Sequence, residues 1–189
     1  MEKLQLFTDL PTLETERLIL RKFSKSDAIS VFEFTSDPKV TQYLTWNNHQ
    51  SIEETFEFIK IVHNSYATGQ PAPWAIESKA LKKVIGSIGI VEMNTFFRRA
   101  EIGFLLNRKF WRKGYSYEAI LKVIEFCFQE TDIHRVEATC EVPNTSSANI
   151  LQKAGMRYEG ILQGYGVNNN QPVDMKMFSI LKPNWELPQ

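Results

Sequence analysis

The pattern of apolar and polar positions changes twice within residues 100–119. Residues 100–106 (AEIGFLL) are almost wholly apolar and predict a β-strand buried on both faces, with Glu101 as its one ionisable residue. After a polar turn, apolar residues recur at steps of three and four, namely Ala119, Ile120, Val123, Ile124 and Cys127. This spacing predicts a helix that follows the strand directly.

The turn before this helix is basic and contains a glycine. Arg112, Lys113 and Gly114 lie immediately before the helical pattern. A glycine lets the backbone approach a ligand closely, and the free N–H groups at a helix N-terminus attract an anion. The arrangement indicates a phosphate site, although one glycine between a strand and a helix is as often only a sharp reversal. The two familiar phosphate loops, G-x-x-x-x-G-K-S/T and G-x-G-x-x-G after a strand, are absent from the sequence.

The remaining pattern predicts two helices before the central strand and one after the next. A capping signature at 24–27 precedes a helix, Ser51 begins a second, and residues 143–147 cap a third that ends at Gly155. Strands are predicted at 15–22, 73–77, 84–91, 133–141, 156–162 and 173–181. The order predicts a mixed α/β domain over 1–189, with a three-stranded antiparallel meander and a parallel crossover around the basic turn.

Composition and charge narrow the function classes. The 189 residues suffice for one domain, and 43% of them are apolar. Lys and Arg together number 22, as do Asp and Glu, which argues against a nucleic-acid binder. The chain shows neither a signal-peptide core nor a run long enough to span a membrane, so we expect a cytoplasmic protein.

The cysteines and histidines give no sign of a metal site. Cys127 and Cys140 have neither metal-ligand nor obvious disulfide spacing, and buried structural cysteine is the commoner case. His49, His63 and His134 are scattered through separate predicted elements. We therefore expect no bound metal.

Several blocks of the sequence, in this order, resemble the GNAT superfamily of acetyl-CoA-dependent N-acetyltransferases. The blocks are LETERLILRKFSKSDA, PWAIE, VIGSIGI, AEIGFLLNRKFWRKGYSYEAI, HRVEATCEVPNTSSANILQKAGM, RYEGILQGY and VDMKMFSI. Within the superfamily, they look like the RimJ/RimL branch of ribosomal-protein N-terminal acetyltransferases. The resemblance implies a twisted mixed β-sheet flanked by helices, with acetyl-CoA as co-substrate between splayed parallel strands.

The resemblance also implies which residues bind the coenzyme. Backbone N–H groups of the basic turn would hold the pyrophosphate, through Arg112, Lys113, Gly114, Tyr115, Ser116 and Tyr117, with Trp111 at the first position of the loop. Backbone groups of Phe104, Leu105 and Leu106 would pair with the pantetheine amides. Asn144 and Ser147 would approach the coenzyme, although the pattern alone makes Asn144 an ordinary helix cap.

Two positions depart from the superfamily loop, which usually reads Gln/Arg-x-x-Gly-x-Gly/Ala. Trp111 occupies its first position and Ser116 its last. In addition, Arg112 stands where the RimJ/RimL branch often has glycine. We expect the backbone at Arg112 to be open to a side chain, and the added cation to favour the phosphates, so that binding survives.

Acetyl transfer to an amine needs a base, a polarised thioester carbonyl and a proton for the leaving thiolate. We predict Glu101 as the general base, with an ion pair to Arg98 or Arg99 as the structural alternative. A backbone N–H near Leu105 or Leu106 would hold the thioester oxygen. Many relatives protonate the thiolate with a tyrosine four residues before the helix-ending glycine. Here Leu151 occupies that position, which leaves Ser147, Tyr165 or water.

The acceptor is the least determined part. Tyr43, Trp46 and Tyr165 are predicted to bind it. By the resemblance, the acceptor is an α-amino group of a ribosomal protein or peptide; a small-molecule amine such as a polyamine, amino sugar or drug remains open. A non-catalytic acyl-CoA sensor is the alternative from another class. A homodimer is compatible with the branch and with the apolar C-terminal strand.

Overall fold

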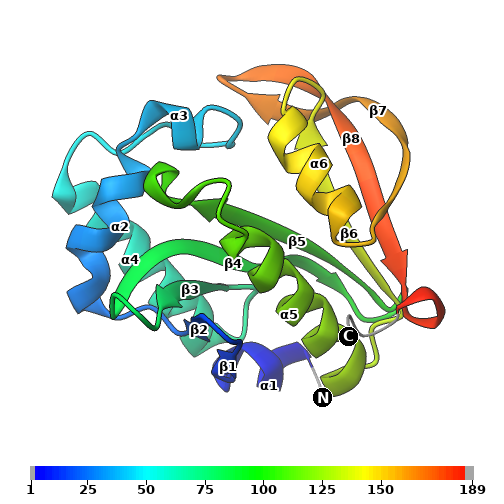
Figure 1. Ribbon diagram of the computed structural model, residues 1–189, viewed down its shortest axis with the longest axis horizontal. Coiled ribbons are helices and arrows are strands. Elements are labelled where there is room, and N and C mark those ends of the chain that lie inside the picture. Colours follow the sequence, from blue (N-terminus) through cyan, green and yellow to red (C-terminus); the bar gives the residue numbers. More distant parts are fainter. Residues whose placement is uncertain (1–2, 186–189) are drawn as a thin grey trace.

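The computed structural model describes residues 3–185, which form one eight-stranded sheet with helices on both faces (Figure 1). The strands are β1 (Leu13–Glu14), β2 (Leu18–Arg21), β3 (Pro73–Ser78), β4 (Lys83–Asn94), β5 (Arg99–Leu106), β6 (Arg135–Glu141), β7 (Arg157–Asn168) and β8 (Gln171–Leu181). Their order in the sheet is β1-β2-β3-β4-β5-β6-β8-β7. Only β5 and β6 pair in parallel among these strands, which confirms the predicted meander and crossover.

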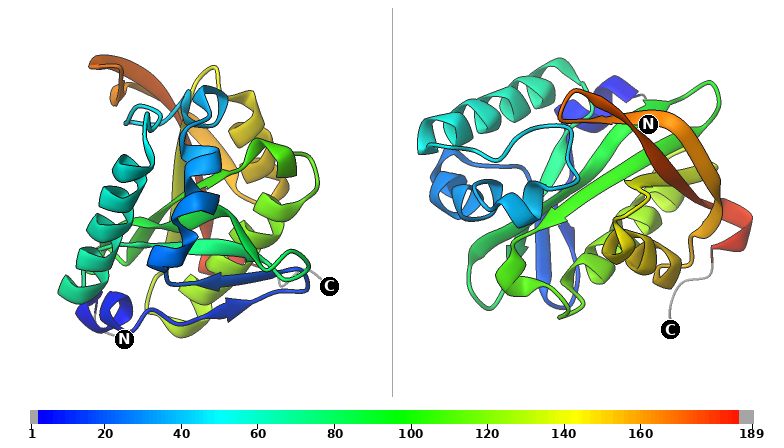
Figure 2. Two further views of the ribbon diagram at one scale, coloured as in Figure 1. Left: turned by 90° about the vertical axis from the view of Figure 1, so that its left-hand side faces the viewer. Right: turned by 90° about the horizontal axis from the view of Figure 1, so that it is seen from above.

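The helices are divided between the two faces of the sheet. They are α1 (Lys3–Thr8), α2 (Ala28–Thr35), α3 (Pro38–Thr41), α4 (Ile52–Thr68), α5 (Tyr115–Glu130) and α6 (Thr145–Lys153). Figure 2 shows α4 and α5 on opposite faces of the sheet. The predicted helix starts are confirmed: Ser24 and Asp27 form a reciprocal capping box on the 3-10 turn that leads into α2, and Ser51 occupies the N-cap position of α4, without a side-chain cap hydrogen bond.

Trp74 joins the sheet to the helix α5. Its side chain is fully buried in β3, its indole N–H donates to the Pro11 carbonyl at 2.7 Å, and its ring meets Phe126 of α5 edge-on at 5.6 Å between centroids. Aromatic rings of this size contribute much of the apolar area that a core buries. Trp74 therefore helps to set the position of α5, whose N-terminus follows the basic turn.

The central strand β5 is buried on one face only, so the prediction of burial on both faces was wrong. Ala100, Ile102 and Leu106 are buried, whereas Glu101 and Gly103 on the other face are half-buried. The reason is that α5 packs against one face, while the face that carries Glu101 is covered only in part. A carboxylate in this strand is therefore accessible.

Several boundaries differ from the sequence prediction. The strands β4 and β7 extend to Asn94 and Asn168, beyond their predicted ends, and the sequence pattern missed α1 and β1.

Within residues 3–185, none of the helices is both long and apolar enough to cross a membrane.

Trp74→Ala should lower the free energy of unfolding by about 3–5 kcal/mol, because it removes a large buried ring and leaves a cavity. Urea unfolding followed by circular dichroism measures this change. Ile29→Ala is the control, since Ile29 is 75% exposed on α2 and its loss should change stability by less than about 0.5 kcal/mol. Equal effects of the two substitutions would contradict the position of Trp74 in the core.

Candidate active site

The site is organised around the point where the parallel strands β5 and β6 separate. In β5 only Arg99–Glu101 pair with β6, and their partners there are Arg135–Glu137. By contrast, β5 stays paired with β4 as far as Leu106. On its other side β6 stays paired with β8 to Glu141. Beyond Glu101 the two strands therefore diverge, as Figure 1 shows. The facing edge of β5 is left without a strand partner over residues 103–106.

An open strand edge can pair with an extended ligand that carries amides. Alternate residues of a strand direct their backbone N–H and C=O toward the same edge, and such an edge binds an added strand through main-chain hydrogen bonds. The Leu106 carbonyl is not available for this, because it accepts the indole N–H of Trp111 at 2.7 Å. Trp111 therefore holds the loop against the end of β5. Asn107, two residues after Leu105, donates its backbone N–H to the Ile85 carbonyl of β4, so the backbone groups of Leu105 are also directed to β4. The backbone of Phe104 and the Leu106 N–H remain at the open edge for the predicted pairing, whereas the expectation for Leu105 was wrong.

The basic turn contains two residues with left-handed backbone. Gly114 has φ +84° and directly precedes α5, while Arg112 has φ +60°. The expectation that the backbone at Arg112 is open to a side chain was wrong, because this conformation costs a non-glycine residue about 1–2 kcal/mol. The Arg112 side chain itself is exposed.

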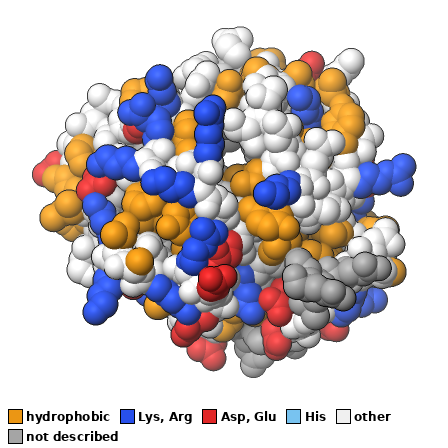
Figure 3. All heavy atoms as spheres, viewed as in Figure 1, with side chains coloured by type: hydrophobic (Ala, Val, Ile, Leu, Met, Phe, Trp, Pro, Cys, Tyr) orange, Lys and Arg blue, Asp and Glu red, His pale blue; other side chains and the backbone are white. Residues whose placement is uncertain are grey.

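The N-terminus of α5 offers unpaired donors beside this turn. Glu118 donates the first helical bond, to the Gly114 carbonyl at 3.0 Å. The N–H groups of Tyr115, Ser116 and Tyr117 therefore have no acceptor within the helix, as at any helix start. Together with the helix dipole, they form a site suited to an anion. Lys and Arg side chains gather on this face around the loop (Figure 3).

The segment before the turn is fixed to the opposite side of the molecule. Arg108 donates to Asp37 at 2.7 Å, and Asp37 also caps α3 by accepting from the Lys39 N–H at 3.0 Å. Lys83 pairs with Glu33 of α2, which lies 3.7 Å from the Lys109 ammonium. These contacts hold residues 107–110 against α2 and α3.

Glu101 lies at the point of separation with one hydrogen-bond donor. Its Oε1 accepts the Thr139 hydroxyl at 2.7 Å. Burial raises the pKa of Glu101 above the ordinary value; the Thr139 hydrogen bond opposes this, and the charges of Glu137 and Glu92 add to it. The carboxylate thus combines partial burial with a raised pKa, which suits a general base.

The alternative ion pair for Glu101 does not form. In the described chain, Arg98 donates to the Asp132 carbonyl at 2.7 Å, while Arg99 pairs with Glu92 and Glu137. Glu101 therefore has no salt bridge to either arginine. Its environment differs from that of a structural carboxylate.

Glu137 is the neighbour of Glu101 across the parallel pair, and its charge is matched by two arginines. It is buried and bonds both Arg99 and Arg135, the latter at 2.8 Å. Arg135 in turn binds Glu159 through two bonds, of 2.8 and 2.6 Å, and lowers the pKa of Glu159 to about 2. Among the residues that the structure describes, this network leaves Glu101 as a half-buried carboxylate without an ionic partner.

The sequence analysis missed Thr139 and Glu137. Both lie on β6 at the period-two spacing that places them on one face. Their relation to Glu101 depends on the register of the β5–β6 pair, in which Glu101 is opposite Glu137. The spacing was visible in the sequence, but the register was not.

Asn144 and Ser147 lie at the start of α6. The Asn144 side chain accepts from the Ser147 N–H at 3.1 Å, so the helix-cap interpretation is confirmed. Ser147 is half-buried and lies near the Cys140 thiol, whose pKa is raised by burial. Leu151 is fully buried in the core and can supply no proton.

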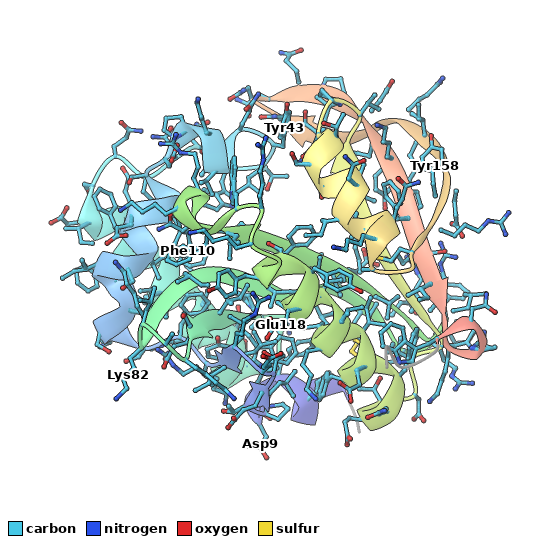
Figure 4. The ribbon with its side chains drawn as sticks, viewed as in Figure 1. Asp9, Tyr43, Lys82, Phe110, Glu118 and Tyr158 are labelled. Atoms are coloured by element: carbon cyan, nitrogen blue, oxygen red, sulfur yellow. The ribbon has the colours of Figure 1, made fainter. Side chains whose placement is uncertain are left out.

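The predicted acceptor residues lie in different surroundings. Tyr43 follows α3, and Figure 4 shows it between α3 and α6. Tyr165 is 54% exposed on β7, close enough to Arg99 to affect its pKa. Trp46, by contrast, packs against His49 and Phe58 at 5.2 and 6.4 Å between ring centroids.

A bridge formed by Asn168 joins the two halves of the molecule near Tyr43. The Asn168 side chain, at the end of β7, donates to the Gln42 carbonyl at 3.0 Å and to Glu141 at 2.5 Å. It thereby connects the β7–β8 hairpin to the segment after α3.

Among the residues that the structure describes, no group of three or more His, Cys, Asp and Glu side chains could hold a metal ion.

Comparisons with known proteins agree with this geometry. Residues 17–157 match the acetyltransferase (GNAT) domain family. An uncharacterized N-acetyltransferase of Bacillus subtilis (strain 168), YoaA, is 36% identical over 92% of this chain and 98% of its own length. The structure of a GNAT-family acetyltransferase from Bacillus anthracis superposes with a TM-score of 0.82 at 29% identity, covering 92% of this chain and 99% of that one.

A further solved structure carries a coenzyme. The RimL ribosomal L7/L12 α-N-protein acetyltransferase in complex with coenzyme A has a TM-score of 0.80 at 19% identity, covering 90% of this chain and 98% of the other. At this identity the likeness concerns the fold. The chain belongs to the GNAT acetyltransferase family, and it is an acetyl-transferring acyltransferase.

Arg112→Gly should raise the free energy of unfolding by about 0.5–1 kcal/mol. Glycine relieves the left-handed strain of about 1–2 kcal/mol, and the greater freedom of the unfolded chain offsets part of the gain. Arg112→Ala keeps the strain and loses the same side chain, so it serves as the matched control in chemical unfolding. If the glycine variant were no more stable than the alanine variant, the backbone at residue 112 would not be left-handed in solution.

Proposed function

We propose that the protein transfers the acetyl group of acetyl-CoA to a primary amine, in particular the α-amino group of a protein or peptide of the ribosomal Ser/Ala N-terminus type. The observation that carries the proposal is the position of Glu101 at the separation of β5 and β6. A base with a raised pKa there lies beside the open edge to which a thioester would be bound. The acetyltransferase family supports the same chemistry.

In the proposal, acetyl-CoA lies in the opening between the parallel strands. The N–H groups of Gly114 to Tyr117 and the dipole of α5 bind its pyrophosphate, and Arg112 and Lys113 add positive charge nearby. The pantetheine pairs with the backbone of Phe104 and with the Leu106 N–H. Asn144 and Ser147 approach it from α6. The RimL complex with coenzyme A supports a coenzyme site in this fold.

The reaction is a direct attack in a ternary complex. Glu101 takes a proton from the acceptor ammonium, and the neutral nitrogen attacks the thioester carbon. The oxyanion of the tetrahedral intermediate accepts a hydrogen bond from a backbone N–H at the open edge of β5, near Leu106. The C–S bond then breaks, the thiolate leaves with the bonding electron pair, and a proton from Ser147, Tyr165 or water completes free coenzyme A.

The surroundings of Glu101 favour a cationic acceptor. The charges of Glu92 and Glu137 are matched by Arg99 and Arg135, whereas Glu101 forms no ion pair within the described chain, so its carboxylate can attract an ammonium group. Tyr43 and Tyr165 border this region. Trp46, which packs against His49 and Phe58, is the third proposed acceptor-binding residue. A polyamine, amino sugar or drug would meet the same charges, which keeps a small-molecule amine as the alternative acceptor. An acyl-CoA sensor without turnover is the alternative outside enzymes.

Isothermal titration with acetyl-CoA should show binding, and addition of N-terminal Ser/Ala peptides should release free thiol. The same preparation is then tested with a panel of small amines. Thiol release with peptides alone supports the proposed acceptor, whereas release with small amines alone contradicts it. Binding without release from any acceptor would favour the sensor, and the absence of binding would overturn the proposal.

Glu101→Gln should lower kcat by about 10²-fold or more, because the amide cannot take the proton, while acetyl-CoA binding is retained. Glu92→Gln is the matched control. It removes the carboxylate opposite Glu101, whose ion pair with Arg99 is exposed, and should change kcat by about fivefold at most. Similar losses in both variants would contradict a specific role for Glu101.

The pH dependence of kcat tests the same assignment. Only the ionised carboxylate accepts a proton, so the rate should fall as the pH falls through the pKa of Glu101. Because burial raises this pKa, the midpoint of the acidic limb should lie above the ordinary glutamate value of about 4.3. The limb should be absent in Glu101→Gln. Its persistence there would assign it to another group.

A further inference from the structure

Arg17 reaches the basic turn from a distant part of the chain. It lies between β1 and β2, and its Nη1 donates to the Lys113 carbonyl at 3.0 Å. Its guanidinium carbon lies 4.6 Å from the centroid of the Tyr115 ring. A Cβ atom built at Gly114 would come within 3.2 Å of its Nη2. Arg17 thus contacts three consecutive residues at the start of α5.

Glu118 fixes the direction of the Arg17 side chain from within α5. Its Oε2 accepts from the Arg17 Nε at 2.6 Å, and its Oε1 accepts from the Arg17 backbone N–H at 2.9 Å and from the Thr15 hydroxyl at 2.5 Å. Burial tends to raise the pKa of Glu118, but these hydrogen bonds outweigh it and hold the pKa below the ordinary value. Figure 4 shows Glu118 at the N-terminal end of α5.

The contact with the Lys113 carbonyl determines where the next N–H points. The described backbone has no cis peptide bond, and in a trans peptide the C=O and the following N–H point in opposite directions. With the Lys113 carbonyl directed to Arg17, the Gly114 N–H is directed to the other side of the peptide. Glycine permits many other conformations at this position, so the peptide could rotate if the carbonyl were free.

Stability alone does not account for this arrangement. The Arg17 side chain is 42% exposed, and exposed ion pairs contribute little to folding. What the contacts do is select one orientation of a peptide next to the left-handed residue Arg112. We propose that Arg17 is a positioning residue, which holds the Lys113–Gly114 peptide so that the Gly114 N–H is available to the coenzyme pyrophosphate.

This inference rests on the proposed function, since it assumes that the turn binds pyrophosphate. It predicts a selective defect, because S-acetylpantetheine carries the reacting thioester without the pyrophosphate. Arg17→Gln should lower kcat/KM for acetyl-CoA by about tenfold, the worth of a hydrogen bond to a charged group, and leave kcat/KM for S-acetylpantetheine unchanged. A defect of general folding would affect both donors.

Lys79→Gln is the matched control. Lys79, directly after β3, holds the segment between β1 and β2 through Glu14 at 2.9 Å and the Thr15 carbonyl at 2.7 Å, and within the described chain its side chain makes no hydrogen bond or ion pair with the basic turn. It should leave the ratio of the two kcat/KM values unchanged. Arg17→Lys is the second variant, in case Arg17→Gln folds poorly. It keeps the charge but cannot bond Glu118 and the Lys113 carbonyl through a planar fork, so the selective loss should persist.

The experiment begins with wild-type binding and turnover of acetyl-CoA, using the acceptor that releases thiol. If wild type shows neither, the proposed function fails and the inference fails with it. If wild type is active and prefers acetyl-CoA, but the Arg17 variants keep the wild-type ratio or lose both donors equally, the proposed function stands and the positioning role is wrong. A loss confined to acetyl-CoA supports it.

Discussion

The separation of two parallel strands after three residue pairs is the constraint on which the site depends. On one side, β5 follows β4, whose register shifts between Ile90 and Glu92. Such a bulge bends the strand and increases its twist. On the other side, β6 follows β8 without interruption. Each of the two strands thus stays paired with its outer neighbour, β5 with β4 and β6 with β8. The backbone groups of β5 at the opening are left for a ligand.

The turn before α5 depends on contacts from outside itself. It contains the left-handed residues Arg112 and Gly114, and a non-glycine residue keeps such a conformation only where its surroundings determine it. Trp111 holds one end through the Leu106 carbonyl, and Arg17 holds the Lys113 carbonyl at the other. Arg108 and Asp37 add a tie to α3. Strain at one residue is thus balanced by hydrogen bonds from three separate elements.

The sequence predicted the parts of this structure that depend on local pattern. Periodicity and caps located most of the helices and strands, and the order of elements predicted the parallel crossover. Local pattern could not show that one face of β5 is half-open, because this depends on which helix packs where. It could not show the left-handed backbone at Arg112 either, since side-chain type there permits several conformations.

Long-range partners in the site were also beyond the sequence. The Arg17–Glu118 pair joins residues 101 positions apart, and Thr139 reaches Glu101 only through the β5–β6 register. The residue pattern pointed to Glu101 and to the turn, and the resemblance to GNAT proteins added a coenzyme role for the turn, but neither carried information about these supporting residues. Their identity follows from the packing of elements whose register a single sequence does not determine.

The environment of Glu101 reflects a balance between two opposing effects. Burial and the nearby carboxylates raise its pKa, whereas the Thr139 hydroxyl stabilises the ionised form. Were Glu137 without its arginine partners, two unpaired carboxylates would face each other across the strand pair, and one of them would have to take up a proton. Because Arg99 and Arg135 match the charge of Glu137, Glu101 can ionise beside it. The arginine network thus leaves a half-buried carboxylate able to ionise, as the proposed role of Glu101 as a base requires.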